Sequence, residues 1–324
     1  IPMLEPQVVV VHPNDLAGVA FNGVDGVPLY HAVHDTEAVE AAVEAASMPL
    51  GEIVYVPSSL RGEDLGCPDC SLGAMLNLQP MFESLLYREL ESGAIIEDEG
   101  RLAETWSVND DFTEYSFTLR KGMQFHNGWG EVTTDDIEFS FGLMTGEETN
   151  NPQAHVFGKM DLVIDDKYSF RLVSETPSPT VLAALTEMPL AFMVTSKSYW
   201  GSVGEEKARL HPIGTGPYQF KSHEPGVSIT LKAFTEHYRK VPAIAEYKIL
   251  QVPEFNSRLE MLIAGDADLM VGDYDQIETA ESSGLAVSSL KGQRYPTIYL
   301  PFYQEPTGAA ASDPAPWDSN VFGE

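Results

Sequence analysis

Two cysteines lie close enough in sequence to form a disulfide, a redox pair or part of a metal site. Cys67 and Cys70 form a CxxC motif and are the only cysteines in the chain. A structural zinc site needs a second pair of ligands, and thioredoxin-like chemistry needs a strand before the motif and a helix after it. A Gly-rich loop precedes this motif instead. The motif therefore predicts either a local disulfide or two free loop thiols, with redox catalysis as the remaining alternative.

Two histidines and two aspartates are the other residues whose spacing bears on chemistry. His31 and His34 are three positions apart, so on a helix they would share one face with Asp35 nearby, which is a weak indication of a metal site. Ordinary surface histidines are more common, and we predict no metal ligands and no cofactor. Asp135 and Asp136 are adjacent, so on a helix they point in different directions and do not form an acid and base pair.

A glycine pair stands out at residues 211–220, which read HPIGTGPYQF. Such a pair allows a phosphate cradle, a tight entry into a strand, or a close approach of backbone to another group. A dinucleotide fingerprint is excluded, because Pro217 and the alternation after it lead into a strand rather than a helix. The sequence also lacks a P-loop, a GxSxG motif and an HExxH motif. We therefore predict that the protein is not an enzyme and has no catalytic residues.

The charge balance excludes one large class of partner. The chain has 49 acidic and 19 basic residues, a formal net charge of −30. Nucleic-acid binding needs clustered Lys and Arg, and an anionic membrane surface would repel this chain. We interpret the acidity as a source of solubility, with adaptation to high salt as a further reason. No stretch has the roughly 20 apolar residues that span a bilayer, and any export signal is expected to have been removed or never to have existed.

Strands and helices alternate along most of the chain, which predicts an α/β fold. Tyr115, Phe117 and Leu119 alternate with polar residues, as in a half-buried strand. Thr134 is a predicted N-cap with two aspartates in the following turn. Strands are predicted at 52–59, 113–120, 121–131, 167–175, 227–234, 245–253 and directly after Gly265. Helices are predicted at 35–46, 76–90, 134–144, 178–187 and 257–264, the last closed by Gly265.

Several stretches of the chain follow one another in an informative order. The first, at 100–141, reads GRLAETWSVNDDFTEYSFTLRKGMQFHNGWGEVTTDDIEFSF, the second is HPIGTGPYQF, and the third, at 237–270, reads HYRKVPAIAEYKILQVPEFNSRLEMLIAGDADLM. The strand at 52–57 and the helix at 76–90 precede them. In this order and spacing, across residues 50–300, they resemble the family 5 solute-binding proteins of bacterial and archaeal ABC transporters, which include peptide, dipeptide and nickel-chelate binders.

The resemblance implies a periplasmic-binding-protein-like α/β fold, with a mixed β-sheet flanked by helices and an inserted α+β subdomain. In such a fold the solute binds in a cleft between two lobes that close around it. The implied organisation is an N-terminal extension of unknown role at 1–50, a first lobe at 51–90 and 191–270, an inserted subdomain at 91–190, and a crossover at 271–324 toward a second lobe that is missing or truncated.

The resemblance also implies a function. The protein would be the extracytoplasmic substrate-binding component of an ABC importer, capturing a peptide or similar small solute and delivering it to permease subunits in the membrane. It would lie in the periplasm or at the outer face of the cell membrane, where a lipid anchor is one means of attachment. The alternative is a single-lobe structural or protein-interaction module with little solute binding, because one lobe alone cannot clamp a solute.

Candidate ligand contacts are implied on the cleft side of the first lobe. They are Ser58, Ser59, Ser71, Met75, Gln153, His155 and Met188. A nickel-chelate binder typically has an arginine near the last position, so a methionine there indicates an apolar or adaptable wall. The two methionines are equally well explained as core residues. In these proteins the GTGPY element is structural, because its glycines let the backbone turn and pack closely and its proline fixes the exit.

Overall fold

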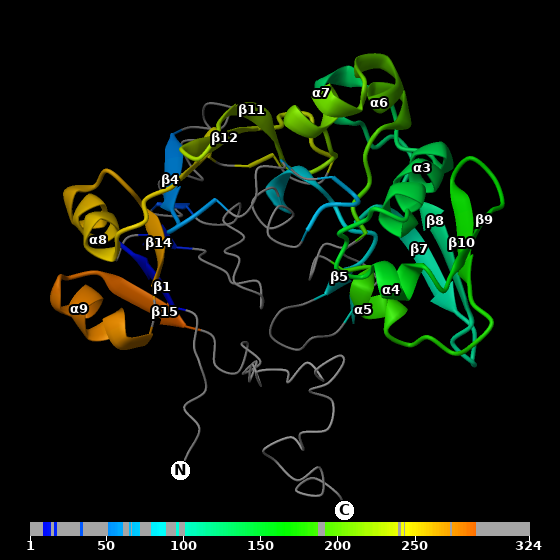
Figure 1. Ribbon diagram of the computed structural model, residues 1–324, viewed down its shortest axis with the longest axis horizontal. Coiled ribbons are helices and arrows are strands. Elements are labelled where there is room, and N and C mark those ends of the chain that lie inside the picture. The colour runs from blue at the N-terminus through cyan, green and yellow to red at the C-terminus, as the bar shows by residue number, and fades with distance from the viewer. Residues whose placement is uncertain are drawn as a thin grey trace, which may run out of the picture.

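Two β-sheets organise the described part of the chain (Figure 1). The structure is a computed structural model, and it describes residues 9–13, 16–17, 33–34, 51–60, 65, 67–71, 79–88, 95–96, 101–186, 192–238, 241–242, 244–272 and 274–289. In Figure 1 the larger sheet lies at the left and along the top, and the smaller sheet lies at the right among the green helices. A mixed larger sheet flanked by helices is the α/β fold that the sequence predicts.

The larger sheet is mixed, with parallel strands at its centre and antiparallel strands on both sides. Within the described residues its seven strands are, in order, β11 (Tyr218–Glu224), β12 (Ser228–Ala233), β13 (Glu246–Leu250), β4 (Glu52–Val56), β14 (Leu269–Gly272), β1 (Val9–His12) and β15 (Ala286–Ser289). β4 pairs in parallel with β13 and β14. The outer strands pair antiparallel.

β1 brings the N-terminal part of the chain into the interior of this sheet. It pairs with β14 on one side and β15 on the other, both from the far end of the described chain. Val10 and Val11 are each 0% exposed and face opposite sides of the sheet, because successive strand residues alternate. Val10 belongs to the same buried cluster as Ile53, and Val11 to the same buried cluster as Val56. Residues 9–12, which lie in the expected N-terminal extension, thus form part of the larger sheet.

The two faces of the larger sheet are covered differently. α8 (Phe255–Ala264) and α9 (Ile277–Ser282) pack on one face (Figure 1). The other face packs against an irregular segment through the buried side chains of Met81 and Phe82. α8 ends as the sequence predicts, at Gly265, whose φ of 78° is the left-handed conformation common just after a helix.

The smaller sheet is antiparallel and lies within the region predicted as an inserted subdomain. In the described residues its four strands are, in order, β7 (Ala103–Val108), β8 (Glu114–Leu119), β10 (Ser169–Val173) and β9 (Asp161–Ile164). Tyr115, Phe117 and Leu119 project into the core from β8 and are at most 2% exposed, which confirms the predicted half-buried strand. Phe117 stacks on Phe170, with ring centroids 5.1 Å apart.

α3 begins where the sequence predicts a helix, with the cap one residue earlier. The helix spans Thr134–Thr145, and Thr133 rather than Thr134 is its N-cap. The side chains of Thr133 and Asp136 each accept a hydrogen bond from the other residue's backbone N–H, which makes a capping box. Asp135 lies in the first turn, where the helix dipole favours negative charge.

Shorter elements make up the rest of the described structure. They are β2 (Leu16–Ala17), β3 (Val33–His34), η2 (Gln79–Met81), β5 (Tyr87–Arg88), β6 (Ile95–Ile96), η3 (His126–Gly128), α4 (Ala154–Phe157), α5 (Val181–Ala184), α6 (Lys197–Val203), α7 (Glu205–Leu210) and η4 (Tyr274–Gln276). Among them β2 pairs with β3, and β5 pairs with β6. The helix predicted at 35–46, together with His31 and Asp35, lies outside the described residues. Except for the strand at 121–131, the predicted strands are confirmed in position. The helices predicted at 178–187 and 257–264 are also confirmed, as α5 and α8.

The helix predicted at 76–90 is wrong in its described part. The 3₁₀ turn η2 is followed by extended backbone that leads to β5. The carbonyls of Ser84 and Leu85 accept hydrogen bonds from the N–H groups of Leu102 and Ala103, so they are not available to a helix. The side chains from 81 to 86 are all buried, whereas an amphipathic helix would expose one face. Tertiary contacts therefore override the helical pattern of apolar residues here.

The strand predicted at 121–131 is also wrong. η3 interrupts this segment, and an isolated bridge between Gln124 and Glu131 is the strand-like pairing that its described residues make. Asn127 has a φ of 59° and Gly128 a φ of 72°, both in the left-handed region that reverses the chain. The segment is a compact turn, and it places His126 in the interior.

Candidate functional site

The glycine pair of the GTGPY element lies against the backbone of another segment. A Cβ at Gly214 would lie 2.1 Å from the Met81 carbonyl oxygen, and one at Gly216 would lie 2.5 Å from that of Pro80. Neither glycine has a positive φ. The pair is therefore required for a close approach of two backbones rather than for a left-handed turn. This confirms the structural interpretation of the motif.

His126 joins the η3 turn to the same glycine pair. Its Nδ1 accepts a hydrogen bond from the Gly214 N–H at 3.2 Å, so its Nε2 carries the proton and donates to the Gly216 carbonyl at 2.8 Å. Burial lowers the pKa of His126 to about 4. The Gly216 N–H in turn donates to the Met81 carbonyl. Because these N–H groups have internal partners, the glycine pair does not present a phosphate cradle.

A buried polar cluster ties the extended 79–88 segment to the rest of the molecule. Glu83 lies 3.1 Å from His237 Nε2, accepts a hydrogen bond from the Tyr238 hydroxyl at 2.9 Å, and lies 4.0 Å from an Arg101 nitrogen. Glu83 and Arg101 side chains are each 2% exposed, so a solute at the surface does not reach them. Sequence patterns do not indicate this cluster, because Glu83 falls in the segment at 76–90 that was predicted to be an amphipathic helix.

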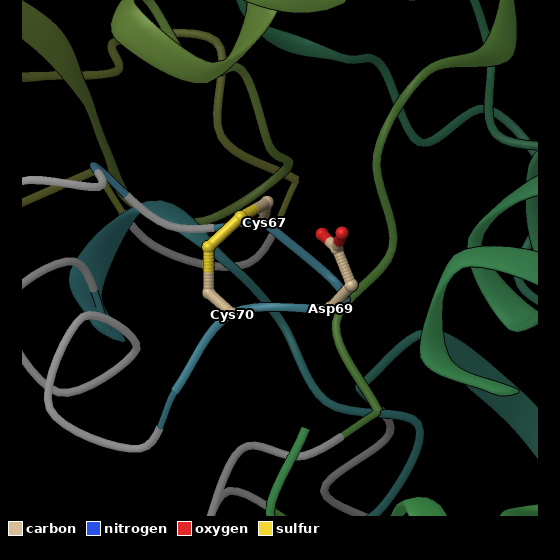
Figure 2. A group of neighbouring side chains, drawn as sticks. All are labelled: Cys67, Asp69 and Cys70. Atoms are coloured by element: carbon tan, nitrogen blue, oxygen red, sulfur yellow. A yellow bond between two sulfur atoms is a disulfide. The ribbon is translucent and has the colours of Figure 1, made fainter. Parts of the chain in front are cut away.

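The CxxC motif forms a disulfide loop, defined here as residues 67–71. Cys67 and Cys70 are bonded to each other, which decides between the two structures that the sequence left open (Figure 2). The Cys70 N–H also donates to the Cys67 carbonyl at 3.1 Å. Both cysteines are buried, with exposed fractions of 1% and 3%.

Asp69 lies beside the two sulfurs, and the three groups are close enough together to suggest a metal site. Their ligand atoms are all within 4.8 Å of one another (Figure 2). A cysteine ligates metal as a thiolate, however, and these sulfurs are bonded to each other. The Asp69 carboxylate is also engaged by an arginine. The loop as it stands is therefore a structural element rather than a metal centre.

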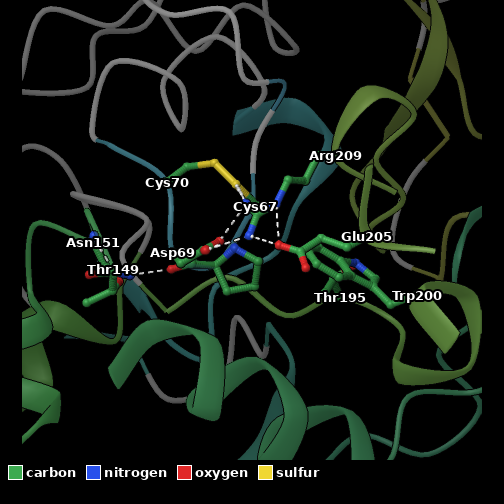
Figure 3. Close-up of a disulfide and its surroundings, with 10 residues drawn as sticks. Cys67, Asp69, Cys70, Thr149, Asn151, Thr195, Trp200, Glu205 and Arg209 are labelled. Atoms are coloured by element: carbon green, nitrogen blue, oxygen red, sulfur yellow. Dashed lines mark hydrogen bonds and ion pairs between the residues drawn. A yellow bond between two sulfur atoms is a disulfide. The ribbon is translucent and has the colours of Figure 1, made fainter. Parts of the chain in front are cut away.

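Arg209, from α7, binds the disulfide loop from one side (Figure 3). Its Nη1 donates to Cys67 Sγ at 2.9 Å and to Asp69 Oδ1 at 3.0 Å, and its Nη2 donates to Asp69 Oδ2 at 2.7 Å. Glu205 accepts two further hydrogen bonds, and the guanidinium lies 5.2 Å from the centre of the Trp200 ring. The hydrogen bonds to Asp69 hold the pKa of Arg209 above its usual range despite partial burial.

A second segment, residues 149–153, binds the same loop from another side (Figure 3). The Asn150 N–H donates to the Asp69 carbonyl at 2.8 Å, and the Asn151 amide donates to the Pro68 carbonyl at 2.7 Å. Asn151 Oδ1 then accepts a hydrogen bond from the Gln153 N–H at 2.8 Å. The disulfide loop and the 149–153 segment thus form one hydrogen-bonded unit.

Two of the predicted ligand contacts lie on this unit. Ser71 ends the disulfide loop and is exposed, and Gln153 ends the adjoining segment and is half-buried. His155 follows on α4 and is exposed. Met75 and Met188 lie outside the described residues.

Ser58 and Ser59 lie in a different loop, directly after β4. Both are exposed. The loop is held at its ends, where the Val252 N–H donates to the Pro57 carbonyl and the Leu60 N–H donates to the Gln251 side chain. Among the described residues, these hydrogen bonds connect the serine loop to the segment before α8 and not to the disulfide loop.

A surface pocket of about 470 Å³ lies at the start of α3. It is lined by Trp129, Gly130, Glu131, Thr133, Asp135, Asp136, Lys197 and Ser198. None of the predicted ligand contacts is among these residues. Burial raises the pKa of Asp136, whose carboxylate accepts hydrogen bonds from the Thr133 and Lys197 N–H groups and so serves to hold α3 and α6 together.

Comparison with known proteins assigns the family. Residues 99–315, more than half of the chain, match the family described as bacterial extracellular solute-binding proteins, family 5 Middle. The chain belongs to this family. The family 5 match includes the η3 turn and the GTGPY element, whose interlocking backbones are described above.

Curated relatives of this family 5 chain are named for peptide binding. The dipeptide-binding protein of Escherichia coli K12 is 28% identical over 190 residues, which cover 52% of this chain and 35% of the relative. The probable di/tripeptide-binding protein 5 of Pseudomonas aeruginosa is 26% identical over 223 residues, which cover 62% of this chain and 41% of the relative. The matched region therefore spans well under half the length of either relative.

Solved structures share the fold of this family 5 chain. The periplasmic binding protein DppA of Helicobacter pylori, in complex with the peptide STSA, aligns with a TM-score of 0.65 at 20% identity, over 74% of this chain and half of that one. At this identity the likeness establishes the periplasmic-binding-protein fold.

Within the described residues, no helix has the length and apolar character that a membrane crossing requires.

Proposed function

We propose that the protein is the solute-binding component of an ABC importer and that it captures a peptide or similar small solute. The observation that carries this proposal is the family match over residues 99–315. Relatives named for dipeptide and di/tripeptide binding support the choice of peptide. So does the Helicobacter pylori neighbour, whose complex holds the peptide STSA. A single-lobe interaction module has no comparable support.

The proposed contact surface consists of polar residues from the loops at 58–59 and 67–71 and from the segment at 153–155. Ser58, Ser59 and Ser71 are exposed, and Gln153 is half-buried. Hydroxyl and amide groups of this kind pair with a peptide main chain, which every peptide sequence shares. Such contacts suit a receptor that accepts many sequences. His155 completes the described part of the surface, and Met75 and Met188 are proposed as its apolar wall.

The proposed partners and location follow from the same family. A receptor of this kind closes over its solute and docks on permease subunits. The family is described as extracellular, so we place the protein outside the cytoplasm, with a lipid anchor as one means of attachment. A formal net charge of −30 disfavours nucleic acid as a partner. The solute is bound and released unchanged, so the role assigns no catalytic residue and no cofactor.

Isothermal titration of the 324-residue chain with alanyl-alanine and with the peptide STSA tests this function. We expect saturable binding of one or both peptides and slower hydrogen exchange at residues 57–60, 67–71 and 149–155 in their presence. Glucose serves as a control solute without a peptide group. If neither peptide produces heat or protection at millimolar concentration, or if glucose does so equally, the peptide-receptor assignment is wrong.

A further inference from the structure

The disulfide loop is held from two sides by segments that are distant in sequence. Arg209 on α7 binds the Asp69 carboxylate through both of its Nη atoms. On the other side, Asn150 and Asn151 bind the backbone carbonyls of Asp69 and Pro68. The loop thus connects α7 to the 149–153 segment (Figure 3).

These contacts depend on the shape that the disulfide gives the loop. Arg209 Nη1 bonds both to Cys67 Sγ at 2.9 Å and to Asp69 at 3.0 Å, so the sulfur and the carboxylate must stand side by side to receive it. The Pro68 and Asp69 carbonyls lie between the two bonded cysteines, where the crosslink restricts the backbone. Asn151 is only 5% exposed, so its amide would lose a buried partner if the loop moved away.

We propose that the Cys67–Cys70 disulfide and Arg209 form a redox-sensitive brace that holds the 149–153 segment against the loop ending at Ser71. Reduction releases the brace and loosens both segments. A consequence, which rests on the proposed function, is that reduction weakens solute capture, because the two segments that carry Ser71 and Gln153 are no longer held together. Arg209 is then a positioning residue that acts through the loop and not by touching the solute.

The chemical step is a two-electron reduction by a dithiol. Because both cysteines are buried, a thiolate of the dithiol reaches a sulfur when the loop opens locally; it attacks that sulfur, the Cys67–Cys70 bond breaks, and a mixed disulfide forms. The second thiol of the reductant then displaces the protein sulfur and closes the reductant's own disulfide. The protein gains two electrons and two protons as two thiols. The crosslink closes a very short loop, so its removal gives local loosening rather than global unfolding.

Hydrogen exchange measured by mass spectrometry on the full chain tests the brace without a ligand. The oxidised protein is compared with protein reduced by dithiothreitol and alkylated, and with the variant Cys67→Ser/Cys70→Ser, which separates loss of the bond from the bulk of the alkyl groups. We expect hydrogen exchange at 67–71 and 149–154 to be about tenfold faster in the reduced, alkylated protein and in the double variant than in the oxidised protein. The exchange rate in β8 should be unchanged. Equal exchange at 149–154 in oxidised and bond-free protein overturns the proposal.

Arg209→Met tests the positioning residue, with Arg171→Met as the matched control. Arg171 also bonds two carboxylates, those of Asp165 and Glu114, but on the smaller sheet. We expect faster hydrogen exchange at 149–154 in oxidised Arg209→Met than in the wild type, and an unchanged exchange rate there in Arg171→Met. Reduction should add little in Arg209→Met, because both changes remove the same contacts. Fully additive effects, or an equal effect of the control, contradict a shared brace.

Titration with alanyl-alanine and STSA in both redox states separates this inference from the proposed function. We expect roughly tenfold weaker binding after reduction, a loss of preorganisation rather than of the site. If the oxidised protein binds neither peptide, the proposed function fails while the exchange result still decides the brace. If the exchange changes but affinity does not, the brace exists and its link to solute capture is refuted.

Discussion

His126 and Gly214 hold each other by two hydrogen bonds that run in opposite directions. The His126 N–H donates to the Gly214 carbonyl at 2.9 Å, and the Gly214 N–H donates to His126 Nδ1 at 3.2 Å. One residue belongs to the η3 turn and the other to the entry of β11. This reciprocal pair joins the η3 turn to the segment that enters the larger sheet, so a change at either residue should affect the stability of the fold.

Gly214→Val should destabilise the protein strongly. Its Cβ would lie 2.1 Å from the Met81 carbonyl oxygen and 2.8 Å from the Phe82 ring, so one of the two backbones must move. We expect the free energy of unfolding to fall by about 3 kcal/mol or more. Urea unfolding followed by circular dichroism measures this. An unchanged unfolding midpoint would contradict the structural role of the glycine.

Gly201→Ala is the matched control for that substitution. Gly201 lies in α6, where a Cβ added to it would have no other atom within 4 Å. Alanine is the better helix former, so we expect a gain of roughly 0.5 to 1 kcal/mol rather than a loss. Opposite signs for the two glycines would show that the loss at Gly214 comes from the backbone approach and not from replacing glycine as such.

His126 should make the protein lose stability in mild acid. Its pKa is about 4 in the folded protein, below the ordinary value of 6.5, because burial disfavours the charged ring. The unfolded chain therefore takes up a proton first as the pH falls. The contribution of neutral His126 is complete above pH 6.5 and is lost between pH 6.5 and pH 4, on the order of 3 kcal/mol in total.

Urea unfolding at a series of pH values, on wild type and on His126→Asn, measures this contribution. The variant should be less stable at about pH 7.5 and should lose less further stability by about pH 4.5. His155→Gln is the control, because His155 is exposed on α4. A wild-type profile that is flat over this range, or one that His155→Gln flattens equally, would exclude His126 as the acid-sensitive group.

The sequence predicts those elements whose pattern of buried and exposed side chains follows their own periodicity. The alternation of Tyr115, Phe117 and Leu119 with polar residues indicates β8, because every second side chain of a strand faces the core. The 79–88 segment also has helical spacing of its apolar residues, yet its backbone bonds to Leu102 and Ala103 instead. Hydrogen-bond partners that are distant in the chain leave no trace in the spacing of apolar residues.

The ligand contacts stay predictions of the family resemblance. Two of them, Ser71 and Gln153, lie on two segments that the structure shows to be hydrogen-bonded to each other. The role of Arg209 was not predictable, because its partner Asp69 lies 140 positions earlier. An arginine on a short helix gives no sign in the sequence of the carboxylate that it binds.

β1 should be required for the stability of the larger sheet, and Val10→Asp tests this. Val10 is 0% exposed and sits between β14 and β15, so an aspartate there would bury a charge without a partner. We expect a loss of about 3 kcal/mol or more in urea unfolding. Val227→Asp is the control, since Val227 is 41% exposed beside β12 and should change stability by less than about 0.5 kcal/mol. If Val10→Asp is as well tolerated as the control, residues 9–12 do not belong to the folded sheet in solution.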